Sequence, residues 1–538
     1  MKEKTFRALA ERCFTEHRDR RLAVETSGNQ VLSYTEGYQL VQLASAQLRQ
    51  QGIGKGDIIL TYTPLSLESV ILCWACLYNG VVFVPVDHNW PLELLQFILK
   101  ETAPKIVLTD ASRVNGLAGM DYDGMLLLAG SQQEYLLAPL FLEWLSPVDP
   151  EGKEAEVMVQ GLDASTSEEM VSPNDLAVIL YTSGSTGLPK GVMLSQQALF
   201  NSGHLIATHF RWEPGDLFMN LGDLHSMSGL RNTCFAPLHA GASFVIASPE
   251  ERNNILLSLE LIQALGITYL GVAPTVIRQM NILCSESRKS KTSSLKAVMC
   301  TGGPLTKEQL RLFWENYGIP VLNYYGLTET AGICSGHTLD TFDPEDNSIG
   351  PASGAELIVF PSAESDDEEG TGELLVKSEN LMSGYYKREE ETSRVLKNGC
   401  FYTGDIVRQR TDGCFELLGR KRNIVKNIHS ELIYLEEIEN ALESHPSVLE
   451  AATCPYARLE EDEKIVAFVV CKDCAGKDGQ QIINDIRGYM AQKVGKNRMP
   501  WCYYLEEQLP RSTAGKIQRQ LLNEKLNGYI KEHRTGYF

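Results

Sequence analysis

One short segment of this chain combines glycine, hydroxyl and lysine residues in a pattern suited to phosphate binding. It reads YTSGSTGLPKG from Tyr181 to Gly191 and directly follows a strongly apolar run. Glycine permits close backbone approach, while hydroxyl and N–H groups bind phosphate oxygens and lysine adds a mobile positive charge. The segment is not a Walker loop, because Pro189 precedes the lysine and a glycine follows it. The sequence therefore predicts a phosphate loop with the candidate ligands Thr182, Ser183, Gly184, Ser185, Thr186, Gly187 and Lys190.

Five further motifs follow this loop in order along the chain. They read TGGPL (301–305), NYYGLTET (323–330), YTGD (402–405), GRKRNIVKN (419–427) and PRSTAGKIQR (510–519). A single match of this kind is weak, but six matches in one order are specific. In these motifs the chain resembles the adenylate-forming superfamily of AMP-binding enzymes, which includes acyl-CoA synthetases, peptide-synthetase adenylation domains and luciferases. The resemblance implies ATP, Mg²⁺ and a thiol, either coenzyme A or phosphopantetheine, as cofactors and co-substrates.

The motif YYGLTET has the side chains needed to hold a nucleotide and its metal. Tyr325 offers an aromatic face to a purine, and Gly326 permits close backbone approach. Thr328 can donate a hydrogen bond to a phosphate, and Glu329 can hold Mg²⁺, which prefers carboxylate and phosphate oxygens. On its own, Glu329 would be taken for a surface carboxylate. The resemblance implies the same roles and adds Thr182 to the metal site.

Two further nucleotide contacts are expected in the later motifs. Asp405 can accept hydrogen bonds from both ribose hydroxyls, as the matching aspartate of the family does. The alternative is an aspartate that only stabilises the turn after Gly404. Arg420 is then expected to contact the ribose or a phosphate from the hinge between two domains.

Lys516 is the residue that we expect to assist acyl-adenylate formation. It lies in a glycine-containing loop, and a flexible ammonium between a carboxylate and the α-phosphate would neutralise the charge that develops during attack. It would also reduce the repulsion between the two anions and fix their approach. Without the neighbouring Pro510 and Gly515, a solvated surface lysine would be the default interpretation.

The residues that bind the acid are harder to identify. His225 matches a histidine that gates the acyl pocket in many acyl-CoA synthetases, whereas a structural core histidine is the alternative. Gly302 and Gly303, together with GVAPT (271–275), are expected to line the same pocket, and both glycines are candidates for nucleotide contact. No aspartate stands out as a partner for an amino group, so a plain carboxylic acid is favoured over an amino acid.

The implied reaction has two steps. A carboxylate attacks the α-phosphorus of ATP and pyrophosphate leaves; a thiol then attacks the acyl carbon and AMP leaves. Both steps depend on positioning and on charge stabilisation. The resemblance implies that a small C-terminal domain rotates between the steps about Arg422, removing Lys516 and aligning a thiol tunnel.

Three departures from the family pattern bear on the thiol and the acid. Ser430, beside His429, stands where many relatives have glycine in the turn that lines the thiol tunnel, and its side chain would narrow the path. Leu435 replaces a frequent proline before a helix. Gly222 and Asp223 stand where relatives often have proline and an apolar residue.

The order of strands and helices predicts the frame that must position these residues. Strand-like runs at 57–62, 81–87 and 105–110 alternate with a helix at 66–80, and further strand-like runs at 268–274 and 296–303 continue the pattern. A helix is expected from Gln196. The segments 146–174 and 362–372 are expected to form loops. Such alternation predicts an α/β fold with doubly wound βαβ units and a largely parallel sheet.

The pattern changes near Gly419. Beyond it, helices from about 435 and 480, strands at 464–471 and 501–506, and a helical tail indicate a small α+β unit of about 120 residues. We therefore predict a large, multi-sheet N-terminal domain over 1–419 that binds ATP and the acid. A small, mobile α+β C-terminal domain would occupy 420–538.

Composition limits the classes of function. The chain has 538 residues and a net charge of -20, which argues against nucleic-acid binding. Its 13 cysteines are mostly scattered; Cys73 and Cys76 lie in an apolar run and are expected to be buried on a helix. Without a signal-like or membrane-length apolar run, no integral membrane segment is expected, and the cytoplasm is the default location.

Three hypotheses remain open from the sequence. The first is a carboxylic acid–thiol ligase that forms acyl-CoA; the second is an acyl-[carrier protein] ligase with a phosphopantetheine acceptor. The third is a nucleotide-binding paralogue that has lost turnover, against which Lys516, Glu329 and Asp405 argue. The carboxylic acid, the pathway and the oligomeric state are not defined by the sequence.

Overall fold

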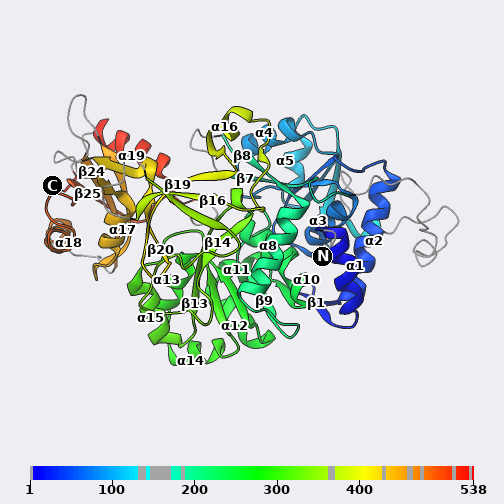
Figure 1. Cartoon of the computed structure of the whole chain (residues 1–538), viewed down its shortest axis with the longest axis horizontal. Coiled ribbons are helices and arrows are strands. Elements are labelled where there is room, and N and C mark those ends of the chain that lie inside the picture. The colour runs from blue at the N-terminus through cyan, green and yellow to red at the C-terminus, as the bar shows by residue number, and fades with distance from the viewer. Residues whose placement is uncertain are drawn as a thin grey trace.

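The computed structural model describes most of the chain. The described residues are 4–130, 141–145, 171–182, 188–361, 370–426, 432–456, 464–472, 478–511, 517–531 and 536–537. Within them, three large sheets form the body, and the C-terminal elements form a lobe at one end of the long axis, orange to red in Figure 1. The predicted fold class, a multi-sheet α/β body with a separate small α+β domain, is confirmed. The exact boundary at 419/420 stays a prediction.

The first sheet has seven strands, and its central part is parallel. Helix α3 follows β3 and is capped by Ser66, which accepts from the Ser69 N–H, and by Gly80 at φ 73°. The expected βαβ alternation is therefore present here. In spatial order the strands are β17 (Gly384–Tyr385), β8 (Lys190–Ser195), β7 (Leu176–Thr182), β4 (Val82–Pro85), β3 (Ile58–Tyr62), β5 (Ile106–Asp110) and β6 (Met125–Ala129).

The second sheet has eight strands, and β12, β11, β9, β10 and β1 run parallel between β13 and the edge strand β2. Its helices α12 to α15 cover the lower part of the molecule in Figure 1. In spatial order the strands are β14 (Gly332–Gly336), β13 (Val321–Leu327), β12 (Ala297–Cys300), β11 (Tyr269–Val272), β9 (Leu217–Asn220), β10 (Ser243–Ile246), β1 (Arg21–Glu25) and β2 (Gln30–Ser33).

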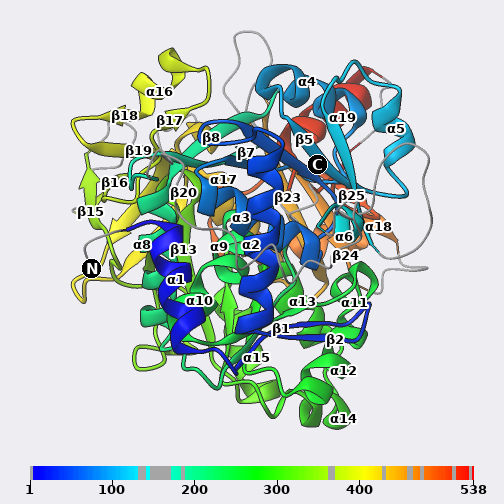
Figure 2. The same cartoon turned by 90° about the vertical axis from the view of Figure 1, so that its right-hand side faces the viewer.

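A third, antiparallel sheet of five strands lies to one side, where Figure 2 shows β15 and β16 on the flank opposite α4 and α5. Its strands are β15 (Glu356–Phe360), β16 (Thr371–Lys377), β19 (Cys400–Gln409), β18 (Leu396–Lys397) and β20 (Phe415–Arg420).

The C-terminal lobe contains a hairpin, a three-stranded sheet and three helices. Their apolar faces form a core of their own, which includes Ile438, Ala467 and Ile483. The elements are β21 (Ile424–Lys426), β22 (Leu432–Tyr434), α17 (Leu435–Glu443), β23 (Val448–Tyr456), β24 (Lys464–Cys471), α18 (Gly479–Lys493), β25 (Cys502–Glu506) and α19 (Arg519–Lys531).

The remaining helices cover the sheets of the body. Among the described residues, no helix is both long and apolar enough to cross a membrane. These helices are α1 (Phe6–Glu16), α2 (Tyr34–Gln50), α3 (Leu67–Asn79), α4 (Leu92–Thr102), α5 (Val114–Ala118), α6 (Phe141–Leu145), α8 (Gln196–His209), α9 (Met227–Cys234), α10 (Ala236–Ala240), α11 (Pro249–Asn253), α12 (Ile255–Leu265), α13 (Pro274–Ile282), α14 (Glu286–Lys289), α15 (Lys307–Tyr317), α16 (Glu389–Val395) and the short turns η1 (Ser290–Thr292), η2 (Thr328–Thr330) and η3 (Lys421–Asn423).

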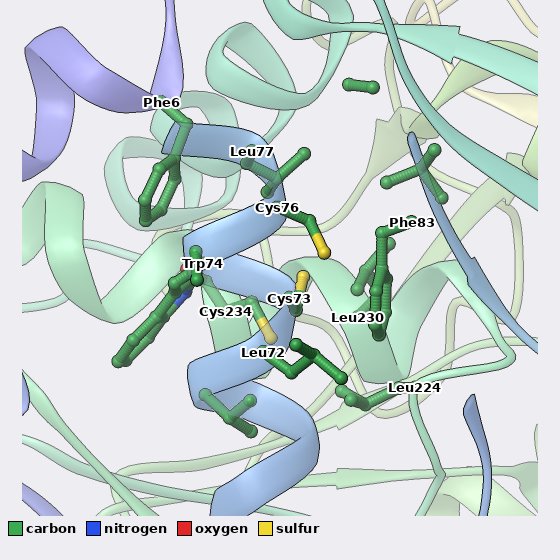
Figure 3. Packing of buried hydrophobic residues seen from close by; sticks show 14 of the residues in the cluster. Phe6, Leu72, Cys73, Trp74, Cys76, Leu77, Phe83, Leu224, Leu230 and Cys234 are labelled. Carbon is green, nitrogen blue, oxygen red and sulfur yellow. The ribbon is translucent and has the colours of Figure 1, made fainter. Parts of the chain in front are cut away.

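The largest core cluster surrounds α3, which is buried along most of its length. Figure 3 shows Cys73, Cys76 and Cys234 in this cluster near Trp74, and the Cys73 thiol interacts with both of the other thiols. Burial raises the pKa of Cys73, Cys76 and Cys300, the last at the end of β12, above the usual thiol range. The prediction that Cys73 and Cys76 are buried helix residues is confirmed.

The predicted elements are present, and the structure adds further strands and helices that the sequence analysis did not predict. The strands predicted in the first third and the helix from Gln196 are confirmed. Strand β8 lies between the phosphate loop and that helix, where no strand was predicted, and β23 was also missed. The predicted loops at 146–174 and 362–372 lie largely outside the described residues.

Candidate active site

The predicted site residues gather where parallel strands end. In parallel sheets ligands bind at the carboxyl ends of the strands. Strands β9, β11, β12 and β13 are neighbours in one sheet, so the residues that follow them lie along one edge. His225 follows β9, Gly302 and Gly303 follow β12, and Glu329 follows β13. In the seven-stranded sheet, Asp87 and Thr182 occupy the corresponding ends of β4 and β7.

The two ends of the phosphate loop face each other across a strand pair. Thr182 ends β7, Lys190 begins β8, and the two residues are register partners. The Lys190 ammonium forms an ion pair with Glu391 and lies 5.4 Å from the centre of the Tyr385 ring. Residues Ser183, Gly184, Ser185, Thr186 and Gly187 lie outside the described residues, and so does Lys516.

Tyr325, Asp405 and Arg420 form a compact group, as their predicted shared role requires. The Tyr325 hydroxyl donates to Asp405 Oδ2 at 2.5 Å, and Arg420 Nε lies 2.8 Å from Asp405 Oδ1. The Asp405 side chain is 2% exposed and that of Arg420 39%. The negative charge of Asp405 raises the pKa of Arg420, whereas burial raises the pKa of Tyr325, with a further contribution from Asp405.

Glu329 is held by a tyrosine that the sequence did not single out. The Tyr385 hydroxyl donates to Glu329 Oε1 at 2.9 Å, and the Glu329 carbonyl accepts from the Met382 N–H. Burial, followed by the Glu329 charge, raises the pKa of Tyr385. The Glu329 charge also contributes to the raised pKa of Arg420, after the larger effect of Asp405. Thr328 begins the short turn η2 beside Glu329.

The glycines of these motifs differ in their surroundings. A Cβ at Gly326 would lie 2.0 Å from the Gly332 carbonyl oxygen, so β13 and β14 can approach only with glycine here. Gly302 has φ 96°, a conformation that disfavours side chains. Gly303 is different, because its nearest neighbour to an added Cβ is Pro274 Cγ at 3.6 Å.

His225 lies in a separate polar group. Its Nε2 atom lies 3.7 Å from Asp87 Oδ2, and the ring centres of His225 and His88 are 6.5 Å apart. Asp223 joins this group through His88 and through an ion pair with the buried Arg252. Burial lowers the pKa of His88, and the charge of Asp223 opposes that shift.

Sequence reasoning therefore missed several partners of the predicted residues. Tyr385, Glu391 and Asp87 contact predicted side chains but belong to no motif that could have marked them. Arg252 pairs with Asp223 and was also not identified. Asp223 was noted only as a departure from the family pattern. The available signal was the position of Asp87 at the end of the strand predicted over 81–87.

Comparison with protein families gives two matches. Residues 10–386 match the family described as AMP-binding enzyme, and residues 437–516 match the AMP-binding enzyme C-terminal domain.

Curated relatives resemble the chain over most of its length. A sulfoacetate–CoA ligase of Cupriavidus necator is 28% identical over 482 residues, covering 88% of each chain. An L-proline–[L-prolyl-carrier protein] ligase of Pseudomonas fluorescens is also 28% identical, over 492 residues that cover 90% of this chain and 92% of that protein. The names of the two relatives thus give different acyl acceptors, coenzyme A for the first and a carrier protein for the second.

Among solved structures, the anthranilate CoA ligase AuaEII in complex with anthranoyl-AMP is similar in fold. Its TM-score is 0.86 at 19% identity, and the match covers 98% of both chains. The likeness extends over the body and the C-terminal lobe together.

Proposed function

This chain belongs to the AMP-binding enzyme family and is an AMP-forming acid–thiol ligase, and from that premise we propose its reaction and the roles of its residues. The family match covers most of the chain and confirms the resemblance inferred from the motifs. The proposed enzyme joins a small carboxylic acid to AMP, releases pyrophosphate and transfers the acyl group to a thiol. Coenzyme A is the acceptor that we favour.

The observation that carries the proposal is the contact of Tyr325, Asp405 and Arg420. Asp405 and Arg420 are register partners on the neighbouring strands β19 and β20, whereas Tyr325 comes from a motif 80 residues away from Asp405, and one carboxylate binds both of the others. An aromatic ring beside a buried carboxylate and a guanidinium matches the needs of a purine, ribose hydroxyls and a phosphate. We assign Gly302, Gly303 and Gly326 to close backbone approach to the same nucleotide.

The residues beside this group suit a metal and a polyphosphate. Glu329 is a half-buried carboxylate with one oxygen engaged by Tyr385, so its second oxygen can serve a hard cation such as Mg²⁺. We propose that Glu329 and Thr182 hold Mg²⁺, which would neutralise phosphate charge when bound. Thr328, Lys190 and the loop residues 183–187 would bind the phosphates themselves.

The chemical steps then need little covalent participation by the protein. An oxygen of the acid attacks the α-phosphorus, and the bond to pyrophosphate breaks. Lys516 would place its ammonium between the two anions and stabilise the charge that develops. The thiol sulfur then attacks the acyl carbon, the thiol loses its proton, and AMP leaves. We assign His225 to the acid side of this site.

The acceptor has a second candidate. Because one relative at 28% identity is named for a carrier protein, an acyl-[carrier protein] ligase is the alternative. Thiol-dependent AMP release separates the two acceptors. Release with free coenzyme A supports the favoured proposal, whereas release only with a phosphopantetheine-bearing carrier protein supports the alternative.

Acid-dependent pyrophosphate exchange into ATP tests the first step. We expect exchange with at least one member of a panel of aliphatic, aromatic and sulfonated carboxylic acids, and none without acid. ATP binding without exchange across the whole panel would contradict the proposal and favour a nucleotide-binding paralogue.

Lys516→Ala is the matched variant for that assay. We expect acid-dependent pyrophosphate release to fall about 100-fold or more, because one stabilising cation is lost at the reacting phosphate. Thioester formation from a supplied acyl-adenylate should be largely retained. Lys493→Ala, at an exposed position of α18, is the control and should behave as wild type. Normal adenylation by Lys516→Ala would show that its assigned role is wrong.

A further inference from the structure

Two histidines and two aspartates from separate parts of the chain meet at the carboxyl ends of two sheets. Asp87 and His88 follow β4, whereas Asp223 and His225 follow β9. One ligand atom each from Asp87, His88 and His225 lies within 4.8 Å of the other two. All four side chains are largely buried, with exposed fractions of 3% for Asp87, 10% for His88, 14% for Asp223 and 17% for His225.

Each carboxylate in this group is held by one oxygen and presents the other to a histidine. Oδ1 of Asp87 accepts from the Asn89 N–H at 3.0 Å, and Oδ1 of Asp223 accepts from the Leu65 N–H at 2.8 Å. The second oxygens face the rings of His225 and His88. Fixing a carboxylate by hydrogen bonds to one oxygen is how proteins orient metal ligands.

The distances between the imidazole nitrogens and the carboxylate oxygens are too long for hydrogen bonds and close to the spacing of two ligand atoms on one metal ion. His225 Nε2 lies 3.7 Å from Asp87 Oδ2, and His88 Nδ1 lies 3.6 Å from Asp223 Oδ2. Hydrogen bonds to nitrogen span about 2.7–3.2 Å. Around tetrahedral Zn²⁺, with bonds of about 2.0–2.2 Å, neighbouring ligand atoms lie about 3.4 Å apart. The ligand atoms of Asp87, His88 and His225 all lie within 4.8 Å of one another, so rotation of these side chains would bring the group to that geometry.

A second observation points to a ligand at the same place. His88 Nδ1 is fully buried and has no hydrogen-bond partner among the described residues. The other ring nitrogen, Nε2, lies 3.1 Å from the Asn89 side-chain nitrogen, which donates to it. Turning that amide so that its oxygen accepts would move the ring proton to Nε2 and leave the lone pair on Nδ1. A buried polar atom without a partner costs free energy, and a bound cation would satisfy it.

We propose that Asp87, His88 and His225 bind one Zn²⁺-like divalent cation, with Asp223 beside His88 as a further oxygen ligand. Two imidazoles and a carboxylate favour Zn²⁺ over Mg²⁺, which prefers oxygen ligands alone. The site is separate from Glu329. The metal assay requires no turnover, so the pyrophosphate assay and the metal assay can fail separately.

Cobalt titration of the tag-free, full-length protein, stripped with a chelator, tests the proposal. We expect visible absorption bands of protein-bound Co²⁺ that saturate near one equivalent and disappear when Zn²⁺ is added. His88→Ala and His225→Ala should abolish these bands. His204→Ala, an exposed histidine on α8, is the matched control and should titrate as wild type.

Thermal melting keeps the test decisive if a variant folds poorly. Zn²⁺ should raise the melting temperature of the wild type and of His204→Ala, but not of His88→Ala. If either alanine variant fails to fold, Asp87→Asn, which keeps the side-chain volume, should weaken Co²⁺ binding about 10-fold or more. Absent bands in excess Co²⁺, or bands that persist in all three cluster variants, would overturn the proposal.

Discussion

At the scale of single residues, the candidate site contains side chains that contact one another. It also contains glycines that allow close approach of the backbone. Tyr325, Asp405 and Arg420, which the motifs singled out, lie in contact in the structure. The motifs could not identify Tyr385 as the partner of Glu329, because the two are 56 residues apart and the contact depends on how β17 is placed. A family motif records the residues that meet the ligand, whereas their supporting partners follow from packing.

The glycines give a prediction that separates structure from ligand contact. Gly326→Ala would drive a Cβ into the Gly332 carbonyl, so we expect it to destabilise the protein by about 1–3 kcal/mol. Gly303→Ala meets nothing closer than 3.6 Å, so its stability should change by less than about 0.5 kcal/mol.

Melting temperature and the KM values for ATP and acid together test this pair. Gly303→Ala should melt as wild type and yet raise one of the KM values, because the new methyl group would occupy space that we assign to a ligand. A Gly303→Ala protein with unchanged KM values, or a Gly326→Ala protein with unchanged melting, would contradict the assignment.

At the scale of elements, periodicity correctly predicted several parallel strands of the body, among them β3, β4, β5, β11 and β12, and the helix α3 between β3 and β4. It failed at β8, because the strand sequence KGVMLS directly follows the glycine-rich loop and was interpreted as part of that loop. It also failed at β23, whose sequence VLEAATCPY lacks regular alternation, since this edge strand of the C-terminal sheet packs on both faces. Burial on two faces removes the polar positions on which sequence patterns depend.

The packing of α10 against α8 gives a pH-dependent prediction. His239 on α10 packs its ring 4.7 Å from Phe200, and burial lowers its pKa to about 3, with smaller effects from His204 and Arg12. A histidine in the unfolded chain has a pKa of about 6.5. The unfolded state therefore binds the proton more readily, and stability that is fully present above pH 6.5 is lost as the pH falls.

His239→Gln measures that contribution, because glutamine does not titrate. Between pH 7 and pH 5 the wild type should lose about 2 kcal/mol more stability than the variant. Urea unfolding at both pH values gives the difference. Equal pH dependence in the two proteins would show that His239 gains its proton without cost in the folded state.

At the scale of the whole molecule, one arginine joins the body to the C-terminal lobe. Arg278 on α13 lies 2.8 Å from Glu443 on α17 and donates to the Leu449 carbonyl at 3.0 Å. Both charged side chains are largely buried, with exposed fractions of 15% and 12%. A buried ion pair leaves an unpaired charge when one partner is removed, so this contact holds the lobe in the orientation seen here.

Arg278→Gln should release the lobe. We expect protease cleavage near the predicted boundary at 419/420 to become about 10-fold faster, which corresponds to about 1.4 kcal/mol of lost docking free energy. Arg311→Gln on α15 removes an exposed charge that pairs only within its own helix and should cleave as wild type. Equal cleavage rates in the two variants would mean that other contacts hold the lobe.

The burial of the cysteines has a consequence for an enzyme that makes a reactive acyl group. An acyl-adenylate acylates thiolates, so each cysteine thiolate near the site would compete with the intended acceptor. Cys300 and Cys334 lie next to the candidate site, but both are buried, and burial raises the pKa of Cys334 to about 12. Buried and protonated cysteines of this kind would not react with the acyl-adenylate, so the enzyme would avoid acylating itself.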